Sequence, residues 1–371
     1  MTRVLASAAL CPPGRPAPGW VAIDDGLVVE IGEGPAPAGA HDTGSALLAP
    51  GLLDLQVNGV GDDDFATADL EGWRRAGRAL LAHGVTTFCP TLVTAPLDAY
   101  DDVLVRASTA CADSETRPMP SIPGVHLEGP FLGGAPGAHP VELVRPVDID
   151  WLHRLLGAFP GLVAIVTLAP EADPGLAATS LLRDRNVTVA LGHSTATYDV
   201  AREAADAGAR LVTHLFNGMA PLHHREPGLA GAALDDERLT PTLIADLVHV
   251  HPAALRLAVT HKRNVALVTD RVATTGLHVT DDGAARLADG TIAGSTLSMN
   301  VAVRNAIGLG IPVERALEMG SVIPADVLGL TDRGRLAPGA RADIVAFDPR
   351  SLAVRAVWVG GELALDAGGD H

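Results

Sequence analysis

Residues 187–214 read VTVALGHSTATYDVAREAADAGARLVTH, and this stretch decides the fold. It opens with an apolar run that ends near Leu191, continues with a helical pattern from Thr197 to Ala207, and closes with a second apolar run that ends near Val212. A short strand, an amphipathic helix and another strand form one unit of a parallel β-sheet. The same alternation continues on both sides of this stretch.

From about Pro50 onward, short runs rich in Val, Ile and Leu alternate with longer amphipathic segments, of which Asp69 to His83 is another example. The runs that predict strands end near Leu55, Phe88, Leu127, Leu168, Leu191, Val212, Leu247 and Thr269. Eight such units predict a (β/α)8 TIM-like barrel. We expect this barrel domain to occupy residues 49–334, with a hairpin insertion at residues 271–296, where DDG and ADG turns occur.

The two ends of the chain follow a different pattern. Residues 1–48 and 335–371 carry short strand patterns, such as WVAIDDGLVVEIG and ADIVAFDP, which are interrupted by turns. We expect both ends to join in one small β-sandwich domain. The predicted class is therefore α/β, a TIM-like barrel with a small β-domain formed by both termini.

Composition and charge exclude several classes of function. The chain has 371 residues, of which 47% are hydrophobic and 19% charged, as in a soluble, well-packed enzyme. A net charge of −17 without a basic stripe argues against nucleic-acid binding and against anionic membranes. No apolar run approaches the length that spans a membrane.

The amino-terminal sequence and the cysteines indicate a cytoplasmic location. MTRVLASAALCPPG has a short apolar run but no small-residue cleavage site, which favours a first β-strand over a signal peptide. The three cysteines are odd in number and show no Cys-x-x-Cys spacing, so neither a disulfide framework nor a thiolate zinc site is indicated.

Polar residues occur where five of the predicted barrel strands end. In such a barrel the chemistry lies at the carboxyl ends of the strands, because the loops there surround a common pocket. The first strand ends in DLQVNG; the third, fifth, sixth and eighth end at Glu128, His193, His214 and Asp270. One histidine at a strand end is most often a capping or solvent-bonded residue. Coincidence at five strand ends favours a functional site.

Glu128, His193 and His214 together predict a metal site. One carboxylate and two imidazoles are the ligand set of a catalytic zinc-like site that leaves a position open for water. Asp270 follows the apolar run VALVT, so its carboxylate is expected at the mouth of the barrel, where it suits a general base and acid. The alternatives are structural histidines and an aspartate that only caps the following loop.

The loop beyond His214, NGMAPLHHREPG at residues 217–228, combines Asn217, Gly218 and Arg225 with two further histidines. Arginine, histidine and backbone amides suit a phosphate group. An exposed basic turn is the more common origin of such a pattern, and His223 and His224 are open to that interpretation.

Further histidines lie near the predicted pocket. His139, in PGAHP, follows Glu128 on a loop rich in Gly and Pro, from which it could reach a substrate carbonyl or hydroxyl. His249 and His251 alternate at the end of the seventh strand, and His251 precedes a proline that begins a helix. The acidic run at residues 62–64 is interpreted as a solvated loop and not as a second metal site.

These motifs resemble those of the N-acetylglucosamine-6-phosphate deacetylases of the amidohydrolase superfamily. PGLLDLQVNG, GVHLEGPF with GAH following, GHS, THLFNGM with HHREPG, DLVHVHP, VTD and IAGSTLSM occur in the family's order and approximate spacing over essentially the whole chain. The resemblance implies an amidohydrolase that acts on a linear amide. The implied reaction is metal-dependent deacetylation of N-acetylglucosamine 6-phosphate to glucosamine 6-phosphate and acetate, in amino-sugar catabolism or recycling.

The resemblance also implies roles for individual residues. Glu128, His193 and His214 would bind the metal and Asp270 would be the catalytic acid and base, in agreement with the spacing. The residues implied to line the sugar phosphate pocket are Ala138, His139, Asn217, Gly218, Arg225, His249, Ile292, Ala293 and Gly294. The resemblance implies a homodimer in which Arg225 reaches the phosphate in the neighbouring active site. The implied cofactor is one divalent metal per subunit, zinc, with iron, manganese or cobalt as alternatives.

Departures from related sequences refine these expectations. Many amidohydrolases carry His-x-His on the first strand and bridge two metals through a carboxylated lysine. Here Gln56 and Asn58 replace the histidines, and Lys262, the only lysine, lies at a helix end, which disfavours a binuclear site but leaves a second, weaker metal open. Leu247 and Arg271 stand where family members often have Gly and Ala, and they bear on which sugar the site accepts.

Three alternatives remain open. The same machinery could act on N-acetylgalactosamine 6-phosphate or another N-acyl amine. A cyclic-amide hydrolase, such as a dihydroorotase or hydantoinase, is disfavoured because His-x-His and a bridging lysine are absent. A zinc-dependent sugar-phosphate binding protein without turnover is disfavoured by Asp270, because binding alone needs no acid or base beside the metal.

Overall fold

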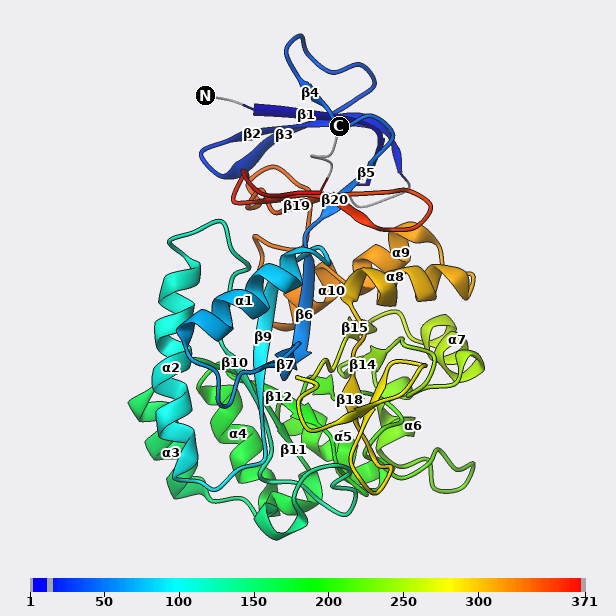
Figure 1. The fold of residues 1–371 in the computed structure, drawn as a ribbon. Coiled ribbons are helices and arrows are strands. Elements are labelled where there is room, and N and C mark those ends of the chain that lie inside the picture. Colours follow the sequence, from blue (N-terminus) through cyan, green and yellow to red (C-terminus); the bar gives the residue numbers. More distant parts are fainter. Residues whose placement is uncertain (1–2, 12–15, 368–371) are drawn as a thin grey trace.

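The computed structural model describes residues 3–11 and 16–367 and shows two stacked parts (Figure 1). The larger part is a barrel of parallel strands surrounded by helices. The smaller part is a β-sheet that lies at the amino ends of the barrel strands, opposite the ends at which the predicted site residues occur. No helix within the described residues is both long enough and apolar enough to cross a membrane.

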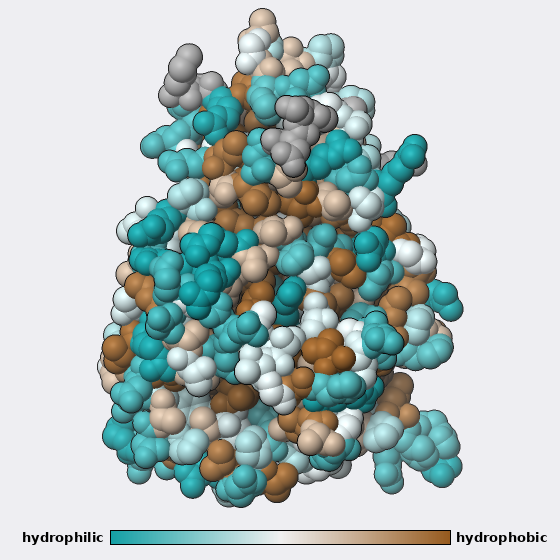
Figure 2. Space-filling view, in the orientation of Figure 1, coloured by the Kyte–Doolittle hydropathy of each residue, from teal (hydrophilic) through white to brown (hydrophobic). Residues whose placement is uncertain are grey.

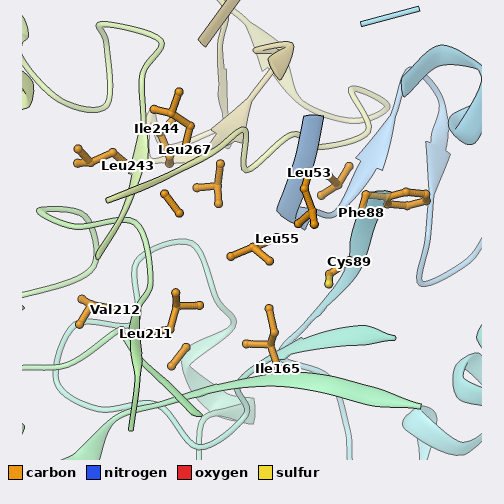
Figure 3. Close-up of a cluster of buried hydrophobic side chains, with 14 of the residues drawn as sticks. Leu53, Leu55, Phe88, Cys89, Ile165, Leu211, Val212, Leu243, Ile244 and Leu267 are labelled. Atoms are coloured by element: carbon orange, nitrogen blue, oxygen red, sulfur yellow. The ribbon is translucent and has the colours of Figure 1, made fainter. Parts of the chain in front are cut away.

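Eight parallel strands of the described chain form the barrel sheet, in sequence order. They are β6 (Leu52–Val57), β9 (Val85–Val93), β10 (Val125–Glu128), β11 (Val163–Leu168), β12 (Thr188–Leu191), β13 (Leu211–Val212), β14 (Thr240–Ile244) and β15 (Ala266–Val268). Each of the eight apolar runs forms a strand, and the predicted TIM-like barrel is confirmed. Figure 3 shows apolar side chains of these strands, among them Leu53, Leu55, Ile165 and Leu267, meeting in a buried cluster.

The barrel closes between its first and last strands through residues that lie just beyond β15. The Asp270 amide donates to the Gln56 carbonyl at 3.0 Å, and the Asn58 amide donates to the Arg271 carbonyl at 2.7 Å. Closure of the barrel therefore fixes the DLQVNG segment directly beside the VTD segment.

Two strands end at positions other than those predicted. β9 continues past Phe88 to Val93, although Pro90 cannot donate a backbone hydrogen bond; the register between β6 and β9 shifts at this point. β14 ends at Ile244, before Leu247. The Asp246 side chain accepts hydrogen bonds from the Val248 and His249 amides and so forms a turn that ends the strand.

The helices of the described residues are α1 (Leu70–Leu81), α2 (Ala99–Ser114), α3 (Ile149–Ala158), α4 (Ala177–Asp184), α5 (Tyr198–Ala207), α6 (Gly228–Asp235), α7 (Pro252–His261), α8 (Met299–Gly308), α9 (Val313–Met319) and α10 (Val322–Val327), with short 3₁₀ helices at Val141–Leu143, Pro170–Ala172 and Pro174–Leu176. The two helices predicted from periodicity begin as expected. Asp69 caps α1 by accepting from the Gly72 amide, and Thr197 caps α5 by accepting from the Val200 amide.

Both ends of the chain contribute to the smaller sheet. Its strands are β1 (Arg3–Leu10), β2 (Ala17–Asp24), β3 (Leu27–Glu33), β4 (His41–Asp42), β5 (Leu47–Pro50), β19 (Ile344–Phe347), β20 (Val354–Val359) and β21 (Glu362–Asp366). The order is β21-β20-β19-β5-β1-β2-β3, with β4 beside β1. Because β5 joins both halves in one hydrogen-bonded sheet, the description as a sandwich stays a prediction, as do the domain limits.

This sheet has its own buried cluster, which includes Leu5, Val21, Ile344 and Trp358. It contacts the barrel near Gly84, in the turn before β9, where the Phe347 ring occupies the space that a side chain would need. The terminal sheet thus supports the end of the barrel that is remote from the predicted site.

Residues 271–296 contain three short antiparallel strands where a hairpin was predicted. These are β16 (His278–Val279), β17 (Ala284–Arg286) and β18 (Ile292–Ser295), in that order. The third strand returns the chain to the barrel, since the Ser295 amide donates to the Asp270 carbonyl at 2.9 Å. We call residues 271–296 the flap. A second small pair, β7 (Gly59–Val60) and β8 (Asp63–Asp64), follows β6.

Candidate active site

Three ligand atoms converge where β10, β12 and β13 end. Oε1 of Glu128 lies 3.0 Å from Nε2 of His193 and 3.0 Å from Nε2 of His214, and the two nitrogens are 3.1 Å apart. A tetrahedral site with metal bonds of ~2.05 Å separates its ligand atoms by roughly 3.3 Å. These three atoms, Glu128 Oε1, His193 Nε2 and His214 Nε2, form a triangle of nearly the size that one small divalent ion requires. We call them the triangle.

The hydrogen bonds on the far sides of the two imidazoles indicate that both Nε2 atoms carry lone pairs. Nδ1 of His193 lies 3.2 Å from the Ala135 carbonyl, and Nδ1 of His214 lies 3.2 Å from the Asn217 carbonyl. A carbonyl only accepts, so each Nδ1 carries the proton and each Nε2 faces the carboxylate as an acceptor. These three buried acceptors face one another with no proton between them, which fits a cation.

The backbone at three of the predicted site residues is left-handed. His193, His214 and Asp270 have φ angles of 49°, 31° and 48°. Residues other than glycine rarely adopt this region, and such strain is concentrated at functional sites. Neighbouring groups hold it in place: Thr242 Oγ1 accepts from the His214 amide at 2.7 Å, and the Gly133 amide donates to the His193 carbonyl at 2.8 Å.

Asp270 lies beside the triangle and is held by two carboxamides. Its Oδ1 accepts from Asn58 Nδ2 at 2.9 Å and from Gln56 Nε2 at 3.2 Å. Gln56 Nε2 also donates to Glu128 Oε1 at 2.9 Å, so this one amide joins the metal triangle to the aspartate. Burial, and after it the charge of Glu128, raises the pKa of Asp270 and favours its action as a proton acceptor.

His139 is buried against the same group and is neutral. Its Nδ1 lies 2.8 Å from the Thr94 hydroxyl and accepts from the Thr94 amide at 3.4 Å. With Nδ1 as an acceptor, the proton lies on Nε2, 4.0 Å from Oε2 of Glu128. Burial, and then the neighbouring His193, lowers the pKa of His139 to about 3. Glu128, His139 and His193 also present ligand atoms within 4.8 Å of one another. Because Nε2 of His139 carries a proton, the tighter triangle with His214 is the better ligand set.

A cavity of about 550 Å³ opens above these groups. It brings together most of the substrate residues that the sequence suggested, namely Ala138, His139, Asn217, Gly218, His249, Ile292, Ala293 and Gly294, with the triangle and Asp270. Flap residues, including Val272 and Leu277, form an apolar wall, and Asp62 and Asp64 line the rim. The acidic run is thus partly a pocket wall, while its middle member, Asp63, pairs with Arg75 at 2.7 Å.

Arg225 does not belong to this cavity. It lies on an exposed loop, residues 221–226, that projects from the barrel between β13 and α6 (Figure 1) and is largely hydrophilic (Figure 2). Its Nη1 lies 2.8 Å from Nε2 of His224 on the same loop. Among the residues that the structure describes, no arginine or lysine lines the cavity. The cavity therefore contains carboxylates and histidines but lacks a permanent cation.

The two histidines after β14 have different positions. Nδ1 of His249 lies 2.6 Å from Oδ2 of Asp246, both side chains are almost buried, and His249 lines the cavity. Burial alone would raise the pKa of Asp246, but the hydrogen bond from His249 holds this pKa below its ordinary value. His251 is exposed and caps α7 by accepting from the Ala253 amide.

Leu247 and Arg271, which depart from related sequences, do not line the cavity. Nη1 of Arg271 lies 3.5 Å from the Leu297 carbonyl. Leu247 occupies the turn formed by Asp246, with a φ of 68° and 37% exposure. Neither residue lines the cavity beside Asp270.

A comparison with protein families matches the amidohydrolase family over residues 47–364. The chain belongs to the amidohydrolase family. It is 40% identical to the N-acetylglucosamine-6-phosphate deacetylase of Bos taurus over 349 residues, which cover 87% of this chain and 84% of the relative. It is 38% identical to the N-acetylgalactosamine-6-phosphate deacetylase of Escherichia coli O157:H7 over 357 residues, which cover 92% and 93%.

A solved structure of a related amidohydrolase is similar throughout. The mutant N-acetyl-D-glucosamine-6-phosphate deacetylase of Mycobacterium smegmatis, in complex with N-acetyl-D-glucosamine-6-phosphate, aligns with a TM-score of 0.90 and 38% identity. The alignment covers 98% of this chain and 99% of that chain. The resemblance inferred from the sequence motifs is confirmed.

Some residues of this amidohydrolase site had no role assigned from the sequence. Gln56 and Asn58 were expected at the end of the first strand, where they replace histidines, but without a role of their own, and no role was predicted for Asp246 or Thr242. The DLQVNG and DLVHVHP motifs contain three of them, so their motif positions were the available signal. Thr242 lies within an ordinary strand, and nothing in its sequence context marks it.

Proposed function

We propose that the protein is a metal-dependent deacetylase of N-acetylamino-sugar phosphates that converts N-acetylglucosamine 6-phosphate to glucosamine 6-phosphate and acetate. The observation that carries this proposal is the triangle of Glu128, His193 and His214 beside the buried carboxylate of Asp270, within one cavity. Similarity to deacetylases over most of the chain supports it.

The metal is the first part of the proposal. Glu128, His193 and His214 would hold one divalent ion, which we propose to be zinc because two imidazoles and a carboxylate suit its ligand preferences. When bound, such an ion lowers the pKa of a water molecule and polarises the substrate carbonyl. Gln56 would keep Glu128 in place through its hydrogen bond to Oε1.

The protein groups around the triangle then account for the proton transfers. Asp270 takes a proton from the attacking water and gives it to the departing nitrogen, which its raised pKa favours. His139, whose Nε2 carries a proton, donates to the carbonyl oxygen as negative charge develops there.

The phosphate requires a cation that the cavity does not itself contain. His249, held by Asp246, together with Asn217 and Gly218, offers polar contacts, but Asp62 and Asp64 on the rim repel a dianion. We therefore infer a homodimer in which Arg225, on its projecting loop, reaches the phosphate in the neighbouring subunit's cavity. A cytoplasmic location, suggested by the cysteines, belongs to this proposal.

N-acetylgalactosamine 6-phosphate is the second candidate substrate. The relative that acts on it is nearly as similar to this chain as the N-acetylglucosamine-6-phosphate deacetylases are. The two sugars differ in the orientation of one hydroxyl group, and the acetamide chemistry is the same for both.

The experiment is a measurement of amine release from both sugar phosphates and from unphosphorylated N-acetylglucosamine. Each is assayed with the purified protein, after chelation, and after zinc is restored. We expect release that requires metal and strongly favours one phosphorylated sugar. Tight binding of both sugar phosphates without release from metal-loaded protein would contradict an enzymatic role and support a binding protein.

A further inference from the structure

Asn58 has an acceptor atom that no group of the described residues satisfies. Its Nδ2 donates to Asp270 Oδ1 at 2.9 Å, and since a carboxylate only accepts, this bond fixes the orientation of the carboxamide. Its Oδ1 is buried, and within residues 3–11 and 16–367 no group donates to it. The residue is 8% exposed and lines the cavity.

The backbone of Asn58 is also held in place. The Asn58 amide donates to the Arg271 carbonyl at 2.7 Å, and the Asn58 carbonyl accepts from the Phe65 amide at 3.1 Å. A buried polar atom without a partner costs about 1–3 kcal/mol. Seven buried side-chain atoms of the described residues lack a partner, and Asn58 Oδ1 is the one among them that belongs to a residue of the cavity lining. An oxygen that is held at this cost in a pocket wall, beside a catalytic carboxylate, indicates that a ligand supplies the donor.

We propose that Asn58 is a catalytic residue that holds Asp270 through Nδ2 and accepts, through Oδ1, the N–H of the scissile amide and then of the departing amine. This inference rests on the proposed deacetylase function. The neighbouring Gln56 is a less suitable acceptor site, because its Nε2 is shared between Glu128 and Asp270 and binds the triangle.

The role follows from what an amide must do to be cleaved. Water adds through its oxygen to the acetyl carbon, and Asp270 takes one of its protons. The C–N bond then breaks with its electron pair going to nitrogen, which receives that proton from Asp270; the other water proton stays with the acid product, which ionises to acetate. An acceptor for the N–H directs the nitrogen lone pair toward Asp270, which prepares the second proton transfer.

The test compares two substrates that differ in the atom Asn58 would contact. One is N-acetylglucosamine 6-phosphate, and the other is its oxygen analogue, in which an acetate ester replaces the acetamide and no N–H exists. For Asn58→Leu we expect kcat/KM to fall ~10- to 100-fold more on the amide than on the ester, the range for a hydrogen bond to a charged or developing group. The wild-type protein serves as the reference for both substrates.

A second variant separates the two ends of the carboxamide. Asn58→Asp keeps an acceptor oxygen but places a second carboxylate beside Asp270, which raises the pKa of Asp270. The acid limb of its pH–rate profile should therefore move to higher pH, while the preference for amide over ester remains closer to that of wild type than in Asn58→Leu.

Controls separate this role from a structural one. Asn300→Leu makes the same substitution at a half-buried residue outside the cavity and should leave both activities unchanged. If Asn58→Leu does not fold, Asn58→Ser is measured in the same way. Metal content is determined for every variant.

Two outcomes would overturn the inference alone: an equal loss on amide and ester, or a second equivalent of metal that binds wild type but not Asn58→Leu. Amine release by wild type from neither sugar phosphate would instead overturn both the inference and the proposed function.

Discussion

His193, His214 and Asp270 share a left-handed backbone conformation that residues other than glycine rarely adopt, and each is the second residue after a barrel strand. The turn of the backbone at each strand end directs the side chain across the mouth of the barrel. Because the conformation is strained, the surrounding hydrogen bonds must maintain it. Position in the sequence therefore indicated these residues, while their mutual geometry depends on the closed barrel.

Replacement of Asp270 tests the acid and base assignment. Asp270→Asn retains an acceptor for the Asn58 and Gln56 amides but cannot take up a proton. We expect turnover to fall by roughly 10²- to 10⁴-fold, the usual contribution of such catalysis. Metal content should equal that of wild type, since Asp270 is not a vertex of the triangle. Turnover at the wild-type rate would exclude the assignment.

Asp54 provides a test of stability against pH. It is fully buried, accepts from the Thr269 hydroxyl at 2.6 Å, and burial raises its pKa to about 7. Since the unfolded value is ~3.9, the protonated form is favoured by folding, and its stabilisation is lost as pH rises through about 7. Between pH 5 and pH 8 the free energy of unfolding of wild type should therefore fall by roughly 3 kcal/mol relative to that of Asp54→Asn.

The measurement is the free energy of unfolding of both proteins at these two pH values. Asp98→Asn, which neutralises an exposed carboxylate, is the matched control and should show no comparable gain. A difference between Asp54→Asn and wild type that does not change with pH would contradict the prediction.

Residues whose partners are distant in sequence were the ones that sequence reasoning could not assign. Asn58 and Asp270 are 212 positions apart, and their hydrogen bond exists only because β6 and β15 close the barrel. Glu128 and the two histidines were identifiable because their residue types alone suggest a metal. An asparagine or glutamine carries no such indication.

The barrel strands bury polar side chains next to the site. Such interiors are commonly filled by branched apolar residues. Here His126 Nε2 lies 2.7 Å from the Thr167 hydroxyl, which lies 2.7 Å from that of Thr213. The hydroxyls of Thr91 and Thr242 accept backbone amides of neighbouring strand ends. This polar layer joins the strands that carry the reactive residues.

The flap strand β18 allows a prediction about packing beside Asp270. At Gly294, where φ is 128°, an added Cβ would lie 2.4 Å from Val272 Cγ1 and 2.9 Å from the Asp270 carbonyl oxygen. Gly294→Ala should displace the Asp270 backbone and lower kcat by roughly 10- to 100-fold, with metal binding retained.

Gly157→Ala is the control for this substitution. Gly157 lies in α3, with nothing within 4 Å of an added Cβ. There alanine should stabilise the protein by ~0.5–1 kcal/mol and leave activity unchanged. Equal kcat values for Gly294→Ala and wild type would show that the flap does not position Asp270.

Strand identity was predictable from sequence, whereas some strand ends were not. Apolar runs marked all eight barrel strands, because parallel strands covered on both faces are continuously hydrophobic. The end of β14 depends on the Asp246 side chain, and the three-stranded flap depends on pairing with the barrel, and neither is visible as periodicity.

For the whole molecule, the two parts have separate tasks. The terminal sheet covers the amino ends of the barrel strands, and the cavity lies at the opposite ends. The loop at residues 221–226 projects away from both, which leaves Arg225 available to a second subunit. We therefore expect the phosphate site to be complete only when two subunits assemble.

Mixing of two inactive variants tests this arrangement. In a dimer of Arg225→Gln with Asp270→Asn, one cavity has a complete set of groups if Arg225 acts across the interface. Co-expressed at equal levels, the two should give about a quarter of wild-type activity at low substrate concentration, since half of random dimers contain one complete site. Activity no higher than the average of the separate variants, or a monomer by light scattering, would contradict it.

Lys262 is the only lysine of the sequence, and its side chain is fully buried, with Nζ 2.6 Å from the Asp236 carbonyl. Reagents that label primary amines therefore meet no lysine on the surface of the folded protein. A released amino sugar can be quantified with such a fluorogenic reagent while the protein is present at high concentration and adds little background. Variants that complete only a few turnovers per site thus become measurable without separating the product from the protein.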